Sequence, residues 1–228
     1  LLNSLYGVLG LPAFRFYDVD NATAVTTTGQ TVIKSTADMA NIKYNKELGT
    51  PDLDSNIYID TDSVFFSAVP LMDKRFPNWK DEEQDTIAGY VNDIAEEMQD
   101  YLNDFYDILS KKIFNVDVDK HRLEIKKEYV AKAGLWIAKK RYAQWIISDN
   151  GVPCDKLDVK GWDVKRSSFP KAFQECMGKV LIDILKGVGE EELTEYVLDF
   201  KKNMENRPNS EIAKNTAVKN LKKYMPKG

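Results

Sequence analysis

The sequence predicts an α+β fold, with helices and strands mixed in its first part and helices alone after Pro170. An apolar run over 56–69 is interrupted by four consecutive polar residues, the pattern of a β-hairpin. Apolar residues recur at three- and four-residue steps over 86–109, with acids between them, the pattern of an amphipathic helix. A similar apolar stripe runs over 172–185, so we place a boundary near Ser167.

The elements of the first half follow from apolar runs and from the residues that break them. We expect, in order, a helix ending within 3–10 at Gly7 and Gly10, an extended aromatic segment at 14–17, a packed helix over 21–44, a loop over 47–55, the hairpin and the amphipathic helix.

The second half is expected to begin with strands and to end with helices. The predicted elements are strands over 123–130 and 135–148 joined through Gly134, a helix over 172–185 closed by Gly187, a helix over 190–202, and a last helix capped by Asn209 and Ser210 and reaching about Tyr224.

The composition limits the class of protein. The 228 residues are 43% hydrophobic and include 12 glycines, which excludes a disordered chain and a fibrous repeat and suits one sizeable domain or two small ones. No apolar run approaches the roughly 20 residues of a membrane span, so we expect a cytoplasmic protein with no membrane partner. The chain begins at Leu1 without an initiator methionine or a signal peptide, and we expect it to be part of a longer protein.

Cysteine and histidine chemistry is not expected. Neither Cys154 nor Cys176 belongs to a CxxC pair, and His121 is the only histidine. These residues are too few for a Cys/His zinc site, a disulfide framework or a Ser-His-Asp triad. His121 lies in the charged run 117–124, and we expect it to be an ordinary exposed side chain.

Charge is unevenly distributed, although the net charge is only −4. Residues 81–109 contain ten acids and no lysine or arginine, whereas residues 111–144 contain ten bases and four acids. A basic face can therefore bind phosphate beside an acidic one, because the local field decides such binding. Charge alone is equally consistent with two solvated surfaces.

The predicted hairpin carries two carboxylates, Asp60 and Asp62, at its tip. A tight turn brings both side chains near one point. Mg²⁺ takes oxygen ligands and needs few from the protein when phosphates supply the rest. Two such ions about 3.5–4 Å apart can hold the attacking and leaving oxygens of a phosphoryl transfer. The alternative is a plain polar turn, since Asp and Ser favour turns.

Three motifs, in order along the chain, resemble those of the family B DNA polymerases. The residues YIDTDS at 58–63 resemble motif C, NSLYG at 3–7 the end of motif B on the fingers helix, and KKRY at 139–142 the KKRY motif. The runs YDVDNATA at 17–24 and SSFPKA at 167–172 resemble the T-even phage branch. Together these motifs span most of the chain, and a phage-encoded member would work in the cytoplasm of its host cell.

The resemblance implies roles for the matching residues at the hairpin. Asp62 would hold both catalytic Mg²⁺ ions, Asp60 would support the site beside it, and Thr61 and Ser63 would shape the turn. Motif A, which supplies the second metal-binding aspartate, does not occur in this sequence, so that ligand would come from outside this chain.

The other two motifs imply contacts with primer–template DNA and an incoming dNTP. Asn3 and Tyr6 would face the nascent base pair, with Tyr6 at its minor-groove edge. The primer terminus would be tracked by Lys139, Lys140, Arg141 and Tyr142.

Physical chemistry supports a cation at the primer end, because every Watson–Crick pair presents a hydrogen-bond acceptor in the minor groove. Lysine and arginine side chains can also bind phosphates there, in a salt-dependent way. The alternative is a solvated strand end, with Trp136, Tyr142 and Trp145 in the core rather than stacked on bases.

The resemblance also implies a domain organisation, with partners for a longer parent protein. Residues 1–10 would end the fingers helix, 11–166 would form the palm with an antiparallel sheet and backing helices, and 167–228 would form part of a helical thumb. The partners would be the remaining fingers, exonuclease and amino-terminal domains, and a sliding clamp, although 224–228 shows no clamp-binding motif. We expect the parent to polymerise DNA and this chain alone to be inactive.

Two other functions are consistent with parts of the sequence. A strand followed by Asp-Thr-Asp-Ser also resembles the opening motif of haloacid dehalogenase-type phosphatases, in which Asp60 would be the nucleophile. Those enzymes continue into a loop and a helix, whereas the run 64–66 predicts a second strand here. The other alternative is a non-catalytic module that binds DNA.

Overall fold

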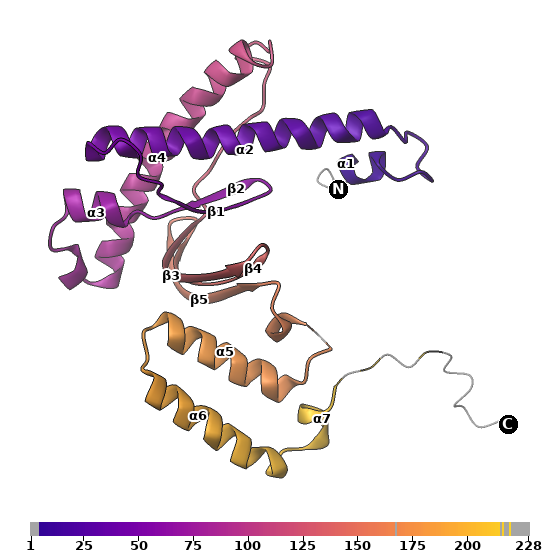
Figure 1. Cartoon of the computed structure of the whole chain (residues 1–228), viewed down its shortest axis with the longest axis vertical. Coiled ribbons are helices and arrows are strands. Elements are labelled where there is room, and N and C mark those ends of the chain that lie inside the picture. Colours follow the sequence, from indigo (N-terminus) through magenta and orange to yellow (C-terminus); the bar gives the residue numbers. More distant parts are fainter. Residues whose placement is uncertain (1–4, 167, 215, 217–218, 220–228) are drawn as a thin grey trace. The chain divides into compact units, whose positions relative to one another are not determined.

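The computed structural model describes residues 5–166, 168–214, 216 and 219, and it contains helices and two antiparallel sheets (Figure 1). This mixture confirms the α+β class. The chain divides into two compact units, Leu1–Glu128 and Tyr129–Gly228. None of the described helices is both long enough and apolar enough to cross a membrane.

The first unit consists of helices and one hairpin. Its elements are α1 (Leu5–Leu9), α2 (Val19–Leu48), β1 (Asn56–Asp60), β2 (Ser63–Phe66), α3 (Val69–Arg75), the 3₁₀ turn η2 (Trp79–Asp81) and α4 (Gln84–Lys112). The predicted hairpin and both long helices are confirmed. α2 begins where Asp18 accepts the Asn21 amide at 2.9 Å and ends at Gly49, whose φ is 77°.

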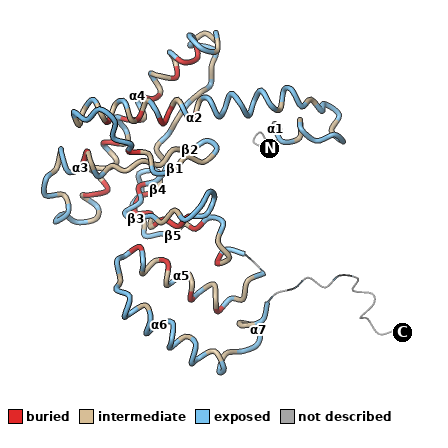
Figure 2. Tube along the Cα trace, in the orientation of Figure 1, coloured by how far each residue is buried: buried red, intermediate tan, exposed pale blue. Residues whose placement is uncertain are grey.

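The core of the first unit lies between α3, α4 and the second half of α2. Tyr44, Met72, Met98 and Leu102 are each at most 1% exposed. The buried positions of α2 begin only at Ile33, and the part of the helix before them is mostly exposed (Figure 2). The helix predicted over 21–44 is therefore present, but only its second half is packed as expected.

Two local predictions in the first unit are wrong. The aromatic segment at 14–17 is not extended, because the Phe14 amide donates to the Leu11 carbonyl at 2.8 Å and the Tyr17 amide to the Phe14 carbonyl at 3.0 Å. These bonds close two successive turns. Gly7 lies inside α1, which ends at Leu9 just before Gly10.

The second unit is a three-stranded sheet followed by helices. Its elements are β3 (Tyr129–Ala138), β4 (Arg141–Asp149), β5 (Val152–Lys160), η3 (Asp163–Lys165), α5 (Lys171–Leu185), α6 (Glu190–Asn203), η4 (Met204–Asn206) and α7 (Asn209–Ile212). The strands are antiparallel in the order β3-β4-β5. One face of this sheet packs against α5, where Ala143 and Val159 meet Leu181 and Leu185.

The strand boundaries differ from the prediction at Gly134. The chain reverses at Lys139 and Lys140, and Gly134 lies inside β3. Its missing side chain leaves room for Trp136, since a Cβ at position 134 would lie 2.2 Å from an indole carbon. The glycine therefore serves packing within a strand and not a turn.

Residues 123–128 form no strand, although their composition predicts one. Side chains of α4 satisfy their backbone instead: the Ile125 amide donates to Asn103 Oδ1 and the Lys127 amide to Gln99 Oε1, both at 2.9 Å. A helix that supplies hydrogen-bond acceptors thus replaces a partner strand.

The helices predicted over 172–185 and 190–202 are confirmed, and Gly187 follows the first with a φ of 79°. The last predicted helix is shorter than expected: α7 ends at Ile212 and its N-cap is Pro208, with Asn209 and Ser210 inside the helix. The predicted end at Tyr224 and the predicted boundary at Ser167 lie outside the described residues.

Candidate functional site

Asp60 and Asp62 lie at the tip of the β1–β2 hairpin, as predicted. Asp60 pairs with Ser63 across the strands, Tyr58 pairs with Phe65, and Thr61 and Asp62 form the two-residue turn. The rings of Tyr58 and Phe65 are 5.9 Å apart. Cross-strand partners share a face of a sheet, and so do residues two positions apart in one strand. The aromatic pair Tyr58 and Phe65 therefore lies on the same face as Asp60.

The base of the hairpin is attached to α2 by side-chain amides. Asn41 Oδ1 accepts the Ser55 amide at 2.9 Å, and Asn56 Nδ2 donates to the Ala37 carbonyl at 3.1 Å. Phe66 packs against Tyr44 in the core, with 6.1 Å between ring centroids. Burial raises the pKa of Tyr44 to about 12, so its phenol stays protonated there. The packed half of α2 thus supports the hairpin that carries the carboxylates.

The turn itself is tight and holds Thr61 in an unusual backbone conformation. The Asp62 amide donates to the Asp60 carbonyl at 2.6 Å, which closes a γ-turn around Thr61, whose φ is 51°. A positive φ is rare for a β-branched residue. Thr61 Oγ1 donates to Asp60 Oδ1 and Ser63 Oγ donates to the Asp60 carbonyl, each at 3.1 Å. Thr61 therefore orients the Asp60 carboxylate, and Ser63 holds the Asp60 backbone.

The donor set at the tip fits a hard divalent cation only in part. Asp62 is exposed, Asp60 is half-buried, and both supply carboxylate oxygens. Across the described residues, no group of three or more His, Cys, Asp or Glu side chains is placed to hold a metal ion. The tip therefore offers two carboxylates, and a magnesium site there stays a prediction that requires a further ligand.

The second predicted motif forms the turn between β3 and β4. Ala138 pairs with Arg141, so Lys139 and Lys140 are the two turn residues, and Lys140 has a φ of 60°. The side chains of Lys139, Lys140 and Arg141 are exposed. Arg141 Nε donates to the Gly161 carbonyl at 3.4 Å, which links the turn to the end of β5. Two neighbouring cations therefore lie on this turn and a third, Arg141, lies at the first residue of β4.

The aromatic side chains near this turn belong to the protein interior, as the core alternative predicts. Tyr142 is 6% exposed and stacks on its cross-strand partner Trp136, with ring centroids 6.4 Å apart. Trp145 packs with the core beneath α5, and its indole donates to Asp155 at 2.7 Å. These rings support the sheet and do not form an exposed platform for bases.

The motif at 3–7 is only partly described. Asn3 lies outside the described residues, and Tyr6 belongs to α1. The predicted contacts of both residues with a nascent base pair stay predictions.

His121 is not the exposed side chain that its charged neighbours predict. Its side chain is 12% exposed, Nε2 lies 2.7 Å from Asp107 Oδ1, and Nδ1 accepts the Leu123 amide at 3.2 Å. The ring therefore ties the end of α4 to the segment that follows it. Cys176 is buried and Cys154 half-buried, and both are free thiols.

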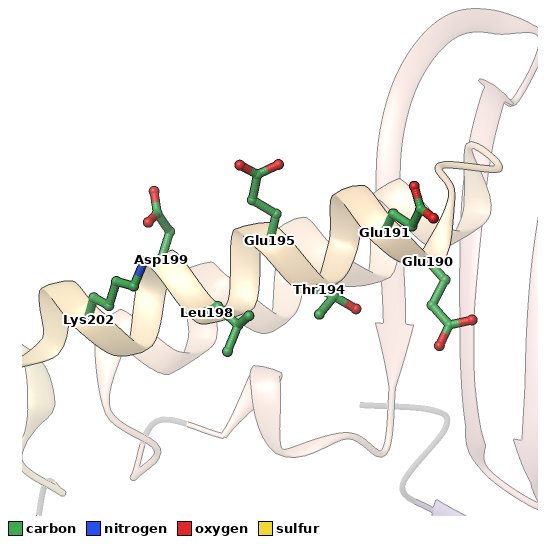
Figure 3. Close-up of a pocket in the computed structure, with 7 residues that line it drawn as sticks. All are labelled: Glu190, Glu191, Thr194, Glu195, Leu198, Asp199 and Lys202. Atoms are coloured by element: carbon green, nitrogen blue, oxygen red, sulfur yellow. The ribbon is translucent and has the colours of Figure 1, made fainter.

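A shallow hollow of about 590 Å³ lies on α6, away from both motifs in sequence (Figure 3). One helix supplies its whole lining, which includes Glu190, Glu191, Glu195 and Asp199. Its acidic side chains would repel phosphate, so it is a solvated helix face and not a nucleotide site.

Comparison with known proteins gives one family. The family model "DNA polymerase family B" matches residues 1–76 and 89–226. The chain is 32% identical to a DNA-directed DNA polymerase of Enterobacteria phage T4, over 100% of this chain and 26% of that protein. It is 31% identical to a DNA-directed DNA polymerase of Escherichia phage RB69, over 79% of this chain and 21% of that protein. A DNA polymerase alpha catalytic subunit of Arabidopsis thaliana is 27% identical over 98% of this chain. The chain spans about a quarter of the length of the phage relatives.

Proposed function

The chain belongs to DNA polymerase family B, and we propose that it is the part of a DNA-directed DNA polymerase that carries motif C and the cations of the primer end. In the parent reaction the primer 3′-hydroxyl attacks the α-phosphate of a dNTP and pyrophosphate leaves. We assign 1–10 to the end of the fingers helix, 11–166 to the palm and 167–228 to part of the thumb.

The observation that carries the proposal is the pair of aspartates on the β1–β2 turn. Asp62 is the exposed ligand, and Asp60 is the carboxylate that Thr61 orients. When bound, Mg²⁺ supplies charge stabilisation for the reacting phosphate oxygens. The chain's own contribution is the pair of carboxylates on the hairpin turn, of which Thr61 orients Asp60, and one further aspartate comes from outside this chain in this proposal.

The turn at 139–142 supplies the contacts with primer–template DNA in this proposal. Lys139, Lys140 and Arg141 place positive charge where phosphates and minor-groove acceptors of the primer end can meet it. Because all four base pairs offer an acceptor there, such contacts favour a correctly paired end without reading its sequence. Tyr142 acts from the interior by fixing the start of β4 against Trp136.

The antiparallel return of β2 separates this proposal from the phosphatase alternative. In that alternative the chain leaves the aspartate-bearing strand for a loop and a helix, whereas Ser63–Phe66 pairs directly with β1. The hairpin suits motif C, and the phosphatase alternative gains no support from it.

Two assays test the proposal. In the first, the anisotropy of labelled primer–template DNA is followed across a salt series for the wild type, Lys140→Ala and the control Lys202→Ala on α6. We expect binding that weakens with salt, and a slope of log K against log salt that falls by about 1 for Lys140→Ala and not for the control. No binding at low salt, or equal effects of both variants, would contradict it.

The second assay is primer extension with dNTPs and Mg²⁺. We expect none from this chain alone, because two of the required carboxylates do not complete a two-metal site. Extension by this chain that Asp62→Asn abolishes would show that the expected inactivity is wrong. In the parent protein, Asp62→Asn should abolish extension while leaving DNA binding unchanged.

A further inference from the structure

Gly161, directly after β5, lies against the backbone of the turn at 139–142. A Cβ built at position 161 would be 2.0 Å from the carbonyl oxygen of Lys140 and 3.2 Å from Cγ of Arg141. The first contact is with backbone, so no side-chain rotation relieves it. Gly161 also has a φ of 71°, a conformation that favours glycine.

Another glycine of the same sheet shows that this contact is specific to position 161. Gly151, in the turn between β4 and β5, has a similar φ of 81°, and nothing lies within 4 Å of a Cβ built there. An alanine at 151 thus meets only the backbone strain of a positive φ. An alanine at 161 meets the same strain and also the Lys140 carbonyl.

The backbone at Gly161 is held on both sides, so it cannot easily withdraw from the turn. Before it, Lys160 pairs with Tyr142 at the end of the β4–β5 ladder. After it, Trp162 and Val164 pack into the core of the second unit. The nearest atoms that a side chain at 161 would meet belong to Lys140 and Arg141, so it would displace the turn and leave the core in place.

The turn at Lys139 and Lys140 has a backbone conformation that contacts with other residues can stabilise. Lys140 has a φ of 60°, in the left-handed region that a non-glycine residue occupies at some cost. The close packing of its carbonyl on Gly161, together with the Arg141 Nε bond to the Gly161 carbonyl, holds that conformation. The strained backbone of Lys140 and its close contact with Gly161 therefore depend on each other.

We propose that Gly161 is a positioning residue for DNA binding: its missing side chain lets the 139–141 turn pack onto the end of β5 and fixes where the cations of that turn lie. The inference rests on the proposed function, in which those cations contact the primer end. Gly161 itself supplies no group to the DNA.

The test compares Gly161→Ala with the matched control Gly151→Ala in the anisotropy assay. We expect DNA affinity to fall about tenfold for Gly161→Ala, which corresponds to about 1.4 kcal/mol, and less than about twofold for Gly151→Ala. Thermal unfolding of both variants, followed by circular dichroism, measures the strain that they share. Equal losses of DNA affinity in the two variants would overturn the proposal.

A double-mutant cycle with Lys140→Ala separates positioning from a purely structural effect. If Gly161 acts through the turn, Gly161→Ala should weaken binding much less in the Lys140→Ala background than in the wild type. Full additivity would overturn the inference. If Lys140→Ala alone does not weaken DNA binding, the proposed DNA contact is wrong, and the inference about Gly161 is overturned with it. That result differs from additivity in the cycle, which would overturn the role of Gly161 alone.

A second variant keeps the proposal testable should Gly161→Ala not fold. Arg141→Lys keeps the charge and removes the Nε donor that reaches the Gly161 carbonyl. We expect about threefold weaker binding with an unchanged salt slope, because the number of cations is the same. Wild-type affinity in this variant would count against the link between the turn and β5.

Discussion

The hydroxyl of Tyr106 on α4 donates a hydrogen bond to the hydroxyl of Thr36 on α2, across 2.8 Å. The direction follows from the single proton of Thr36, which is used in a 2.8 Å bond to the Val32 carbonyl. Tyr106 and Thr36 are 3% and 0% exposed. Burial raises the pKa of Tyr106, which keeps its phenol protonated and a donor at neutral pH. The bond joins the two helices whose core supports the β1–β2 hairpin.

The two ends of this bond should differ in their contribution to stability. Tyr106→Phe removes one hydrogen bond and leaves Thr36 bonded to Val32, so we expect the free energy of unfolding to fall by about 1 kcal/mol. Thr36→Val leaves the buried Tyr106 hydroxyl without its acceptor, and we expect a loss of about 2–3 kcal/mol. Urea unfolding of both variants measures the difference. A larger loss in Tyr106→Phe would show that the donor is assigned wrongly.

Arg75 should make the first unit sensitive to acid. Its guanidinium bonds Glu47 at 2.6 and 2.8 Å and Glu97 at 2.9 and 2.7 Å, joining α2, α3 and α4. These bonds hold the pKa of both carboxyls below the usual range. Since the folded-state pKa is lowered, the stabilisation is full above the unfolded value of about 4.3 and is lost as the pH falls through the folded value.

We therefore expect Arg75→Met to lower the free energy of unfolding by about 1–2 kcal/mol at neutral pH, the low end reflecting the half-exposed Glu97. The difference from the wild type should be full above about pH 4.3 and should shrink as the pH falls below that value and through the lowered pKa of the two carboxyls. Lys80→Met, which removes an exposed pair with Asp73 at 3.4 Å, is the control and should lower the free energy of unfolding far less than Arg75→Met does. A pH-independent difference would exclude the carboxylates as its cause.

Periodicity and breakers in the sequence were sufficient to predict the hairpin and the long helices. The stripe through Ile94, Met98 and Leu102 defines the buried face of α4, and Gly187 marks the end of α5. The failures have a common physical origin. Gly134 has the composition of a turn, but it leaves space for Trp136, and 123–128 has the composition of a strand, but α4 supplies its hydrogen-bond acceptors. The first outcome depends on how the Trp136 ring lies over its own strand, and the second on α4 side chains more than twenty positions away in sequence.

The sequence was sufficient to predict which residues form the candidate site, but not which contacts hold them in place. The pattern of 58–63 placed Asp60 and Asp62 on a turn, and the structure has them there. No sequence signal indicated that Lys139 and Lys140 form a turn packed on Gly161, because the contact joins residues about twenty positions apart and Lys-Lys is not one of the residue pairs that favour a tight turn.

Thr61 should be a position where the hairpin stores backbone strain. Its φ of 51° suits glycine, and it is β-branched. We expect Thr61→Gly to leave the free energy of unfolding unchanged or raise it by about 0.5–1 kcal/mol, because the relieved strain offsets the greater freedom of the unfolded chain. The control Thr31→Gly, on the exposed half of α2, should lower it by about 0.5 kcal/mol. Equal losses at both sites would show that Thr61 is not strained.

Divalent-cation binding at the hairpin tip should be detectable in this chain, and weak. Asp60 and Asp62 offer carboxylate oxygens, and no third His, Cys, Asp or Glu of the described residues joins them, so we expect a Kd for Mn²⁺ on the order of 1 mM, as for weak carboxylate sites. Paramagnetic broadening should be centred on the amides of 60–63, and chelation with EDTA should reverse it. Asp62→Asn should abolish that broadening, whereas Asp199→Asn, within the acidic face of α6, should leave it intact. Broadening centred on α6 in the wild type would mean that acidic charge alone, and not the turn, recruits the ion.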